Sequence, residues 1–176
     1  MGLDGKVCII TGGGSGIGRA SAMMMAEEGA TVVVVGRTAS KVNDVKAEIE
    51  AAGGRSASFA LDVADHAAVN LMVRSVKEEF GRIDVLVNNA GIIRVSSFPE
   101  VSEADYDATM GLNARGAYFF MQEVVGQMPD GGHIVNIASG AGIDGKTLSP
   151  PYAASKAALI TMTKTIARVL GPRQIT

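Results

Sequence analysis

Short runs of apolar residues recur along this chain, separated by longer segments whose apolar positions repeat at helical spacing. The runs are too short for a buried helix, and most are rich in β-branched residues, so we predict that they are strands. Most are apolar at consecutive positions, which is typical of strands covered on both faces, as in parallel sheets. The predicted strands are residues 7–10, 31–35, 56–61, 83–87 and 133–138.

The segments between these runs have the periodicity of amphipathic helices. Because strands and helices alternate with short connections, we predict an α/β fold with a doubly wound parallel sheet of the Rossmann type. A chain of 176 residues fits a single domain, residues 1–176. The predicted helices are residues 17–28, ending before Gly29, then 40–52, 66–80, a helix beginning after Ser102, 110–128 and 152–170.

A cluster of glycines follows the first predicted strand, in the sequence TGGGSGIG. Glycine permits positive φ and lets backbone N–H groups approach a phosphate, and the helix that follows directs its positive end to the same place. We predict a phosphate-binding turn here, although similar turns join strands to helices in proteins that bind nothing. Its residues are Gly12, Ser15, Gly16, Ile17 and Gly18.

The end of the second predicted strand bears on the choice of nucleotide. An acidic residue there would accept the ribose hydroxyls and repel a 2′-phosphate. This chain has Gly36 instead, followed by Arg37 and Thr38. Because a guanidinium pairs with phosphate, the sequence favours NADP(H) over NAD(H). The alternative is that Arg37 is a solvated loop residue.

Composition limits the classes of function. The 16 basic and 18 acidic residues nearly balance and are interspersed, so the chain has neither a basic stripe for nucleic acid nor a polybasic patch for a membrane. The single cysteine, Cys8, excludes a disulfide framework. No apolar run is long enough to span a membrane or to act as a signal sequence. We expect a cytoplasmic protein that binds neither nucleic acid nor membrane and has no metal site.

Three motifs in order along the chain resemble the short-chain dehydrogenase/reductase family. They are Thr11-Gly12-x-x-x-Gly16-Ile17-Gly18, then Asn88-Asn89-Ala90-Gly91, and then Ser139 thirteen residues before Tyr152, with Lys156 four residues further on. The resemblance covers essentially the whole chain. It implies strand order 3-2-1-4-5 and an NAD(P)(H)-dependent oxidoreductase that interconverts a small ketone and a secondary alcohol.

The pair Tyr152 and Lys156 carries the chemistry. Residues four apart share a helix face, so the ammonium can lie beneath the phenol and stabilise the phenolate. A Tyr-x-x-x-Lys spacing alone also arises by chance on helix surfaces. The resemblance implies that Tyr152 is the general acid and base, that Ser139 polarises the carbonyl, and that Lys156 binds the ribose hydroxyls. It also implies that Asn113, with Gly116 three residues further on, loosens the helix and holds a water in a proton relay.

The resemblance also assigns the remaining cofactor contacts. Asp62 and Val63 would flank the adenine, although the carboxylate could instead cap the next helix, a role open to Asp65. Asn89, Ala90 and Gly91 would lie against the nicotinamide side of the cofactor, together with Tyr152 and Lys156.

Two predicted helices, residues 110–128 and 152–170, are apolar on more than one face. A helix of this kind buries one face on its own sheet and another elsewhere. We therefore expect a homodimer or homotetramer formed through these helices, an arrangement that the resembled family also uses.

The chain departs from the family pattern after residue 170. Family members continue into a sixth parallel strand and a loop that covers the substrate. We therefore expect a fold truncated at the sixth strand, with residues 134–137 as an unpaired apolar edge and a site without its lid. We expect weak cofactor binding and poor turnover unless another chain or segment covers that edge. The alternative function is a catalytically silent nucleotide-binding or interaction module.

Overall fold

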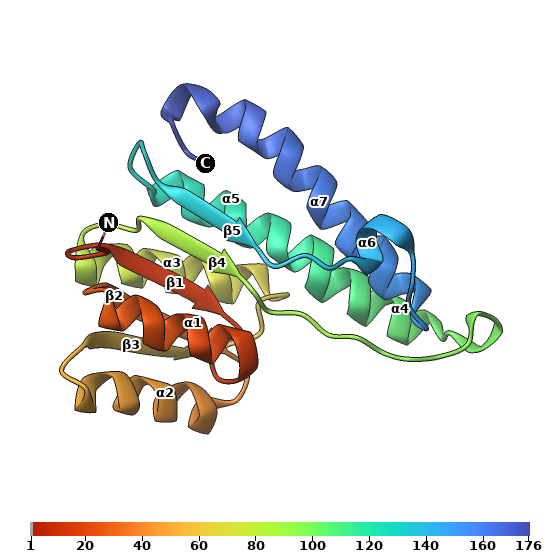
Figure 1. Ribbon diagram of the computed structural model, residues 1–176, viewed down its shortest axis with the longest axis horizontal. Coiled ribbons are helices and arrows are strands. Elements are labelled where there is room, and N and C mark those ends of the chain that lie inside the picture. The colour runs from red at the N-terminus through yellow and green to blue at the C-terminus, as the bar shows by residue number, and fades with distance from the viewer. Residues whose placement is uncertain (1) are drawn as a thin grey trace.

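A computed structural model describes residues 2–176, and its centre is a parallel sheet of five strands (Figure 1). The strand order is β3-β2-β1-β4-β5, which confirms the predicted doubly wound topology. The predicted strands are all present, with ends that differ by one or two residues. They are β1 (Val7–Thr11), β2 (Thr31–Gly36), β3 (Arg55–Ala60), β4 (Val85–Asn88) and β5 (His133–Asn136).

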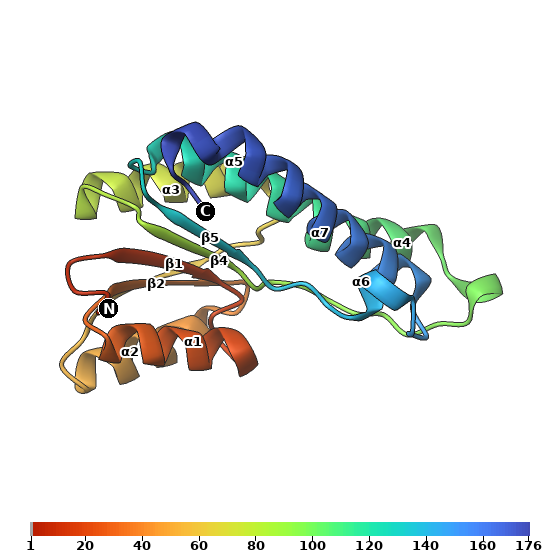
Figure 2. The ribbon, with the colours of Figure 1, turned by 45° about the horizontal axis from the view of Figure 1, so that its top comes forward.

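Helices cover both faces of the sheet (Figure 2). On one face lie α1 (Gly16–Glu27) and α2 (Ala39–Ala51), and on the other α3 (His66–Phe80), α5 (Ala117–Gln127) and α7 (Pro150–Leu170). Successive residues of a strand point to opposite faces, so Cys8 and Ile10 enter one core and Ile9 the other. This explains why the first strand is apolar at every position. Within residues 2–176, no helix is long and apolar enough to cross a bilayer.

One long helical segment runs from residue 103 to 127 and changes its winding in the middle. It consists of α4 (Glu103–Met110), a π-helical turn, η2 (Gly111–Gly116), and α5. Ser102 caps its start, because the Ser102 hydroxyl accepts a hydrogen bond from the Asp105 N–H at 3.1 Å. The prediction gave no π turn. Three short helices were also not predicted, η1 (Phe98–Glu100), α6 (Ala141–Asp144) and η3 (Gly171–Arg173).

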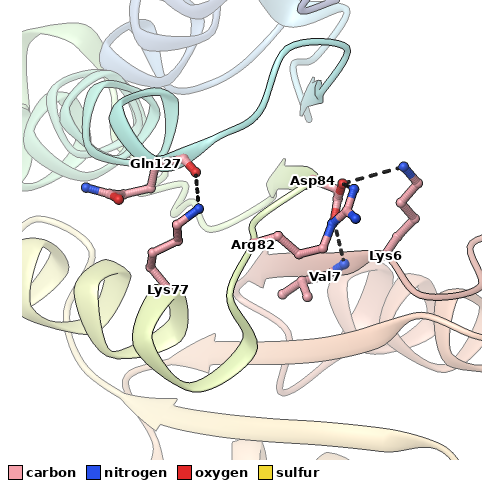
Figure 3. Close-up of polar contacts among 6 residues, drawn as sticks. All are labelled: Lys6, Val7, Lys77, Arg82, Asp84 and Gln127. Atoms are coloured by element: carbon pink, nitrogen blue, oxygen red, sulfur yellow. Dashed lines mark hydrogen bonds and ion pairs between the residues drawn. The ribbon is translucent and has the colours of Figure 1, made fainter.

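A buried carboxylate organises the amino edge of the sheet (Figure 3). Asp84 accepts a hydrogen bond from the Val7 N–H at 3.0 Å and two from Arg82, at 2.8 and 2.5 Å, and the Lys6 ammonium lies at 3.5 Å. The Asp84 side chain thereby links the start of β1 to the start of β4. This cluster lies at the opposite end of the strands from their carboxyl edge, where the candidate site is.

The edge of β5 is partly paired, so the prediction of an unpaired edge over residues 134–137 is wrong at its first residue. The Ile134 N–H donates to the Thr176 carbonyl at 2.8 Å, and the Thr176 N–H donates to the Gly132 carbonyl at 3.1 Å. The turn after α7 makes this pairing possible, because Gln174 takes a left-handed conformation with φ +54° and returns the chain to β5. Val135, in the middle of the strand, remains 44% exposed.

Candidate active site

A groove of about 400 Å³ opens at the carboxyl edge of the sheet, beyond the ends of β1, β2 and β4. Open α/β sheets bind ligands at this edge, where the strand order reverses. The structure brings most of the predicted cofactor residues to this one groove, although they come from four separate segments. Those that line it are Gly12, Ser15, Ile17, Arg37, Thr38, Val63, Asn89, Ala90 and Gly91.

The glycine turn packs so tightly against α1 that Gly18 has no room for a side chain. A Cβ on Gly18 would lie 2.3 Å from the Gly12 carbonyl oxygen and 2.5 Å from Asn89 Nδ2. Gly12 and Gly16 take positive φ values of 64° and 52°, which favour glycine. Gly16 and Gly18 therefore shape the turn, although they do not line the groove themselves.

Two side chains fasten this turn to the segment after β4. Asn89 Nδ2 donates to the carbonyls of Thr11 and Gly12, at 2.9 and 3.2 Å. The Thr11 hydroxyl accepts from the N–H groups of Asn89 and Ala90, each at 3.0 Å. The two sequence motifs therefore form one hydrogen-bonded unit. Thr11 appears in the glycine motif, but sequence reasoning gave it no role.

The far end of the groove is positively charged. Arg37 and Lys41 line it together with Thr38, and no carboxylate is among the groove residues in the described part of the chain. Thr38 is the N-cap residue of α2, but its side chain makes no capping bond. Lys41 was missed by sequence reasoning. The available signal was its spacing of three residues from Thr38, which places both on one side of the first turn of α2.

Asp62 does not line the groove. Its Oδ1 accepts from the Ala64 N–H at 2.9 Å, a local turn of the chain. Asp65 is the N-cap of α3, because its side chain accepts from the Ala68 N–H at 3.1 Å. The structure thus gives Asp65 the helix-capping role that the sequence left open to it.

Lys156 is buried beside Tyr152 on the first turns of α7. Its ammonium nitrogen lies 5.8 Å from the centre of the Tyr152 ring and donates to the Ile137 carbonyl at 2.6 Å. Burial lowers the pKa of Lys156 below its ordinary value, because removal from water disfavours the charged form. The helix spacing therefore brings the two side chains together as the sequence predicts.

Asn113 is buried in the π turn, and both polar atoms of its side chain are hydrogen-bonded. Its Oδ1 accepts from the Ile92 N–H at 2.8 Å, while Nδ2 donates to the Ile92 carbonyl at 2.8 Å and to the Ser155 hydroxyl at 3.1 Å. A Cβ on Gly91 would lie 3.2 Å from Asn113 Oδ1 and 3.5 Å from Lys156 Nζ. Gly91, which also lines the groove, therefore lies between the groove and the pair Asn113 and Lys156.

Ser139 follows β5 and begins the segment that packs on the same part of α7. Its hydroxyl accepts from the Ala141 N–H at 3.2 Å. A Cβ on Gly142 would lie 2.7 Å from the Ala157 nitrogen and 3.0 Å from Lys156 Cβ, so the two segments are in close contact. The four predicted catalytic residues thus come from the π turn, the end of β5 and α7. Ser155, which binds Asn113, was not predicted.

Comparison with known proteins gives this geometry a context. The sequence model of the family described as short chain dehydrogenase matches residues 6–176. The 3-oxoacyl-[acyl-carrier-protein] reductase FabG of Thermotoga maritima is 42% identical over 99% of this chain and 72% of that protein.

Solved structures are similar over nearly the whole chain. A short chain dehydrogenase from Burkholderia cenocepacia, in complex with NADP, has a TM-score of 0.95 at 41% identity, covering 99% of this chain and 72% of that one. An NAD+-bound xylitol dehydrogenase has a TM-score of 0.95 at 35% identity, covering 98% of this chain and 68% of that one. Structures similar to this chain therefore hold either nucleotide.

Proposed function

This chain belongs to the short-chain dehydrogenase/reductase family, and we propose that it transfers hydride between NADP(H) and a small ketone or secondary alcohol. NAD(P)-dependent oxidoreduction is the coarser class that its relatives support. One observation carries the finer proposal. The buried Lys156 lies beside Tyr152 and next to Gly91, at the end of a groove whose other end holds Arg37.

The groove fits a dinucleotide phosphate. Its glycine turn leads into the N-terminus of α1, where backbone N–H groups and the positive end of the helix would attract a diphosphate. Gly12, Ser15 and Ile17 would hold the diphosphate, and Val63 would contact the adenine. Ala90 and Gly91 would accept the flat ring at the catalytic end. When bound, the cofactor supplies or accepts the hydride.

A preference for NADP(H) follows from the charge at the far end of the groove. Arg37 and Lys41 are both cations, and neither faces a carboxylate among the described residues that line the groove. A 2′-phosphate would therefore be attracted by two positive charges there, whereas a ribose without this phosphate would not be. Because similar structures hold either nucleotide, this preference needs its own test.

The test compares binding of 2′,5′-ADP with binding of 5′-AMP, which differ by the 2′-phosphate alone. We expect the wild type to bind 2′,5′-ADP at least about tenfold more tightly, and Arg37→Ala to remove most of that difference. Lys46→Ala is the matched control, because Lys46 pairs with Glu50 on the exposed side of α2. Equal binding of the two nucleotides by the wild type would contradict the preference.

The side chain of Tyr152 would supply the proton, and that of Ser139 would polarise the substrate carbonyl. In reduction, the Tyr152 hydroxyl would donate a proton to the carbonyl oxygen, and in oxidation the deprotonated Tyr152 would accept one from the alcohol. The Ser139 hydroxyl would donate a hydrogen bond to the same oxygen. The Lys156 ammonium would stabilise negative charge on Tyr152. Its lowered pKa means that Lys156 gives up a proton at lower pH than an exposed lysine.

A steady-state assay of NADPH oxidation with a panel of ketones tests this function. We expect Tyr152→Phe to lower kcat/KM by about 10²- to 10⁴-fold and to leave NADPH affinity within about threefold of the wild type. Tyr106→Phe is the control, because Tyr106 is an exposed tyrosine on α4. NADPH binding without turnover that depends on Tyr152 would instead favour a nucleotide-binding or interaction module.

A further inference from the structure

Ser155 stands between the two residues of α7 that carry the proposed chemistry, and it is fully buried. Its hydroxyl donates to the Tyr152 carbonyl at 2.7 Å, and its oxygen accepts from Asn113 Nδ2 at 3.1 Å. A hydroxyl has one hydrogen to donate and lone pairs to accept, so both contacts can exist at once. Ser155 therefore connects the catalytic helix to a residue 42 positions earlier in the chain.

The partner of Ser155 is itself held in one orientation. The Ile92 N–H can only donate, so the atom of Asn113 that it contacts must be the carbonyl oxygen. Both hydrogens of Asn113 Nδ2 are then used, one by the Ile92 carbonyl and the other by Ser155. Loss of the Ser155 oxygen would leave one of these buried donors without its partner.

The same contact lies between the groove and the catalytic lysine. Ile92 follows Gly91, which lines the groove and whose Cβ position is within 3.5 Å of both Asn113 Oδ1 and Lys156 Nζ. Displacement of the Asn113 amide would therefore move Gly91, the groove residue beside Lys156. Lys156 is the next residue after Ser155 on the same turn of α7.

We propose that Ser155 is a positioning residue, whose hydroxyl fixes the Asn113 amide against α7. It thereby sets the positions of Tyr152 and Lys156 relative to Gly91 in the groove. Ser155 touches neither cofactor nor substrate in this role and acts through Asn113. The inference rests on the proposed oxidoreductase function, and it adds to the predicted set of four a residue that the sequence motifs did not single out.

Ser155→Ala tests this role, since it removes one oxygen atom and no carbon. We expect kcat for ketone reduction to fall about tenfold, with KM and the Kd for NADPH within about twofold of the wild type. In an Asn113→Ala background, we expect the same substitution to lower kcat by less than about twofold, because the contact through which it acts is already absent.

Amide hydrogen exchange gives a readout that does not depend on turnover. The Ile92 N–H is bound to Asn113 Oδ1, so a loosened Asn113 should expose it. We expect the Ile92 amide to exchange several-fold faster in Ser155→Ala, on the order of the fall in kcat. Should Ser155→Ala fail to fold, Ser155→Cys keeps a side chain of similar size with a weaker hydrogen-bonding group, and smaller effects in the same directions are expected.

Thr163 provides a matched control on the same helix. Its hydroxyl donates to the Leu159 carbonyl at 2.7 Å and accepts from Asn136 Nδ2 at 2.9 Å, the same pattern two turns further along α7. Thr163→Val should leave kcat and the exchange rate of the Ile92 amide unchanged.

Three outcomes decide the inference. A lower kcat with faster exchange at Ile92, both absent in Thr163→Val, supports it. An active wild type with a Ser155→Ala variant that matches it in kcat and exchange overturns the inference alone. A wild type that binds NADPH but reduces no ketone contradicts the proposed function, and with it any catalytic role for Ser155.

Discussion

Two buried charged side chains, Lys156 and Asp84, differ in what surrounds them. Lys156 has the Ile137 carbonyl as its polar partner, and burial lowers its pKa. Burial raises the pKa of Asp84, but its bonds to Arg82 and Val7 and the charge of Lys6 lower it by more, so the net pKa is below its ordinary value. Removing one partner of a buried ion pair destabilises a fold because the other charge is left unpaired, whereas a buried charge without a counterion in a cleft is a candidate for chemistry.

Asp84→Asn should therefore destabilise the protein. We expect the free energy of unfolding at pH 7 to fall by about 1–3 kcal/mol, because Arg82 and Lys6 lose their counterion and one buried acceptor is lost. The control is Asp130→Asn, which removes a more exposed ion pair with Arg173 and should cost less than about 1 kcal/mol. Urea unfolding followed by circular dichroism measures both, and equal effects would show that burial of Asp84 does not matter.

The same residue predicts a pH dependence. Because the pKa of Asp84 is lowered in the folded state, the unfolded chain binds the proton more readily. The stabilisation is thus present above the unfolded pKa, about 4, and is lost as the pH falls through the lower folded value. We expect the wild type to lose more unfolding free energy than Asp84→Asn between pH 5 and pH 2. Parallel losses would contradict this.

Sequence reasoning located residues whose neighbours are set by spacing along the chain. Tyr152 and Lys156 meet because they are four apart on a helix, and the glycine turn follows from its own composition. Ser155 was missed because its role depends on Asn113, a partner from another segment. Asp62 was assigned to the adenine by resemblance, and in the structure its carboxylate accepts a local hydrogen bond from the Ala64 N–H.

At the scale of elements, helices pack closely against neighbouring turns around the groove, as at Gly18 and Gly116. Gly18 places α1 against the Gly12 carbonyl, and Gly116 ends the π turn where a Cβ would lie 3.0 Å from the Val63 carbonyl. The first contact was expected from the glycine motif. At the π turn, the resemblance implied only a loosened helix at Asn113 and Gly116, because a local sequence pattern does not report the hydrogen bonds between Asn113 and Ile92 that accompany the turn.

Gly18→Ala should separate α1 from the turn. The added methyl group would lie 2.3 Å from the Gly12 oxygen, a backbone atom that cannot move without disturbing the turn. We expect the free energy of unfolding to fall by about 1–3 kcal/mol and NADPH affinity to fall by about tenfold or more. Thermal melts and fluorescence titration with NADPH measure these effects.

Gly126→Ala is the matched control for this substitution. Gly126 is also a helical glycine, but a Cβ there would have no neighbour within 4 Å. It should stabilise the protein by up to about 1 kcal/mol, because alanine is the better helix former. Wild-type NADPH affinity in Gly18→Ala would contradict the packing argument.

At the scale of the whole molecule, the strand order and the two covered faces followed from the alternation of elements. The pairing of β5 with the last residues was not predicted. It depends on a left-handed conformation at Gln174, and the usual sequence signal for that conformation is a glycine. The helices predicted to form an oligomer carry a shallow apolar hollow of about 560 Å³, bounded by α4, the π turn, α5 and α7. Met110, Tyr118, Phe119 and Met162 are among the residues that line it.

We predict that this hollow lies at the contact between two copies of the chain. Tyr118 is 40% exposed there, and a charge at its position would have to be buried in a dimer. Sedimentation should therefore show Tyr118→Glu as a monomer at concentrations where the wild type is dimeric. Leu71→Glu is the control, since Leu71 is exposed on α3, away from the hollow. The same sedimentation for wild type and Tyr118→Glu would rule out this contact.

The central claim is that Tyr152 supplies the proton for hydride transfer at the end of this groove. Its most direct test uses NADPH deuterated at the nicotinamide C4 and a ketone from the panel, with the product alcohol analysed by mass spectrometry. We predict deuterium on the carbinol carbon with the wild type, and labelling that is slower by at least about 10²-fold with Tyr152→Phe, although both bind NADPH. Equal labelling by the two proteins, or a wild type that binds NADPH and transfers no deuterium, would contradict the account.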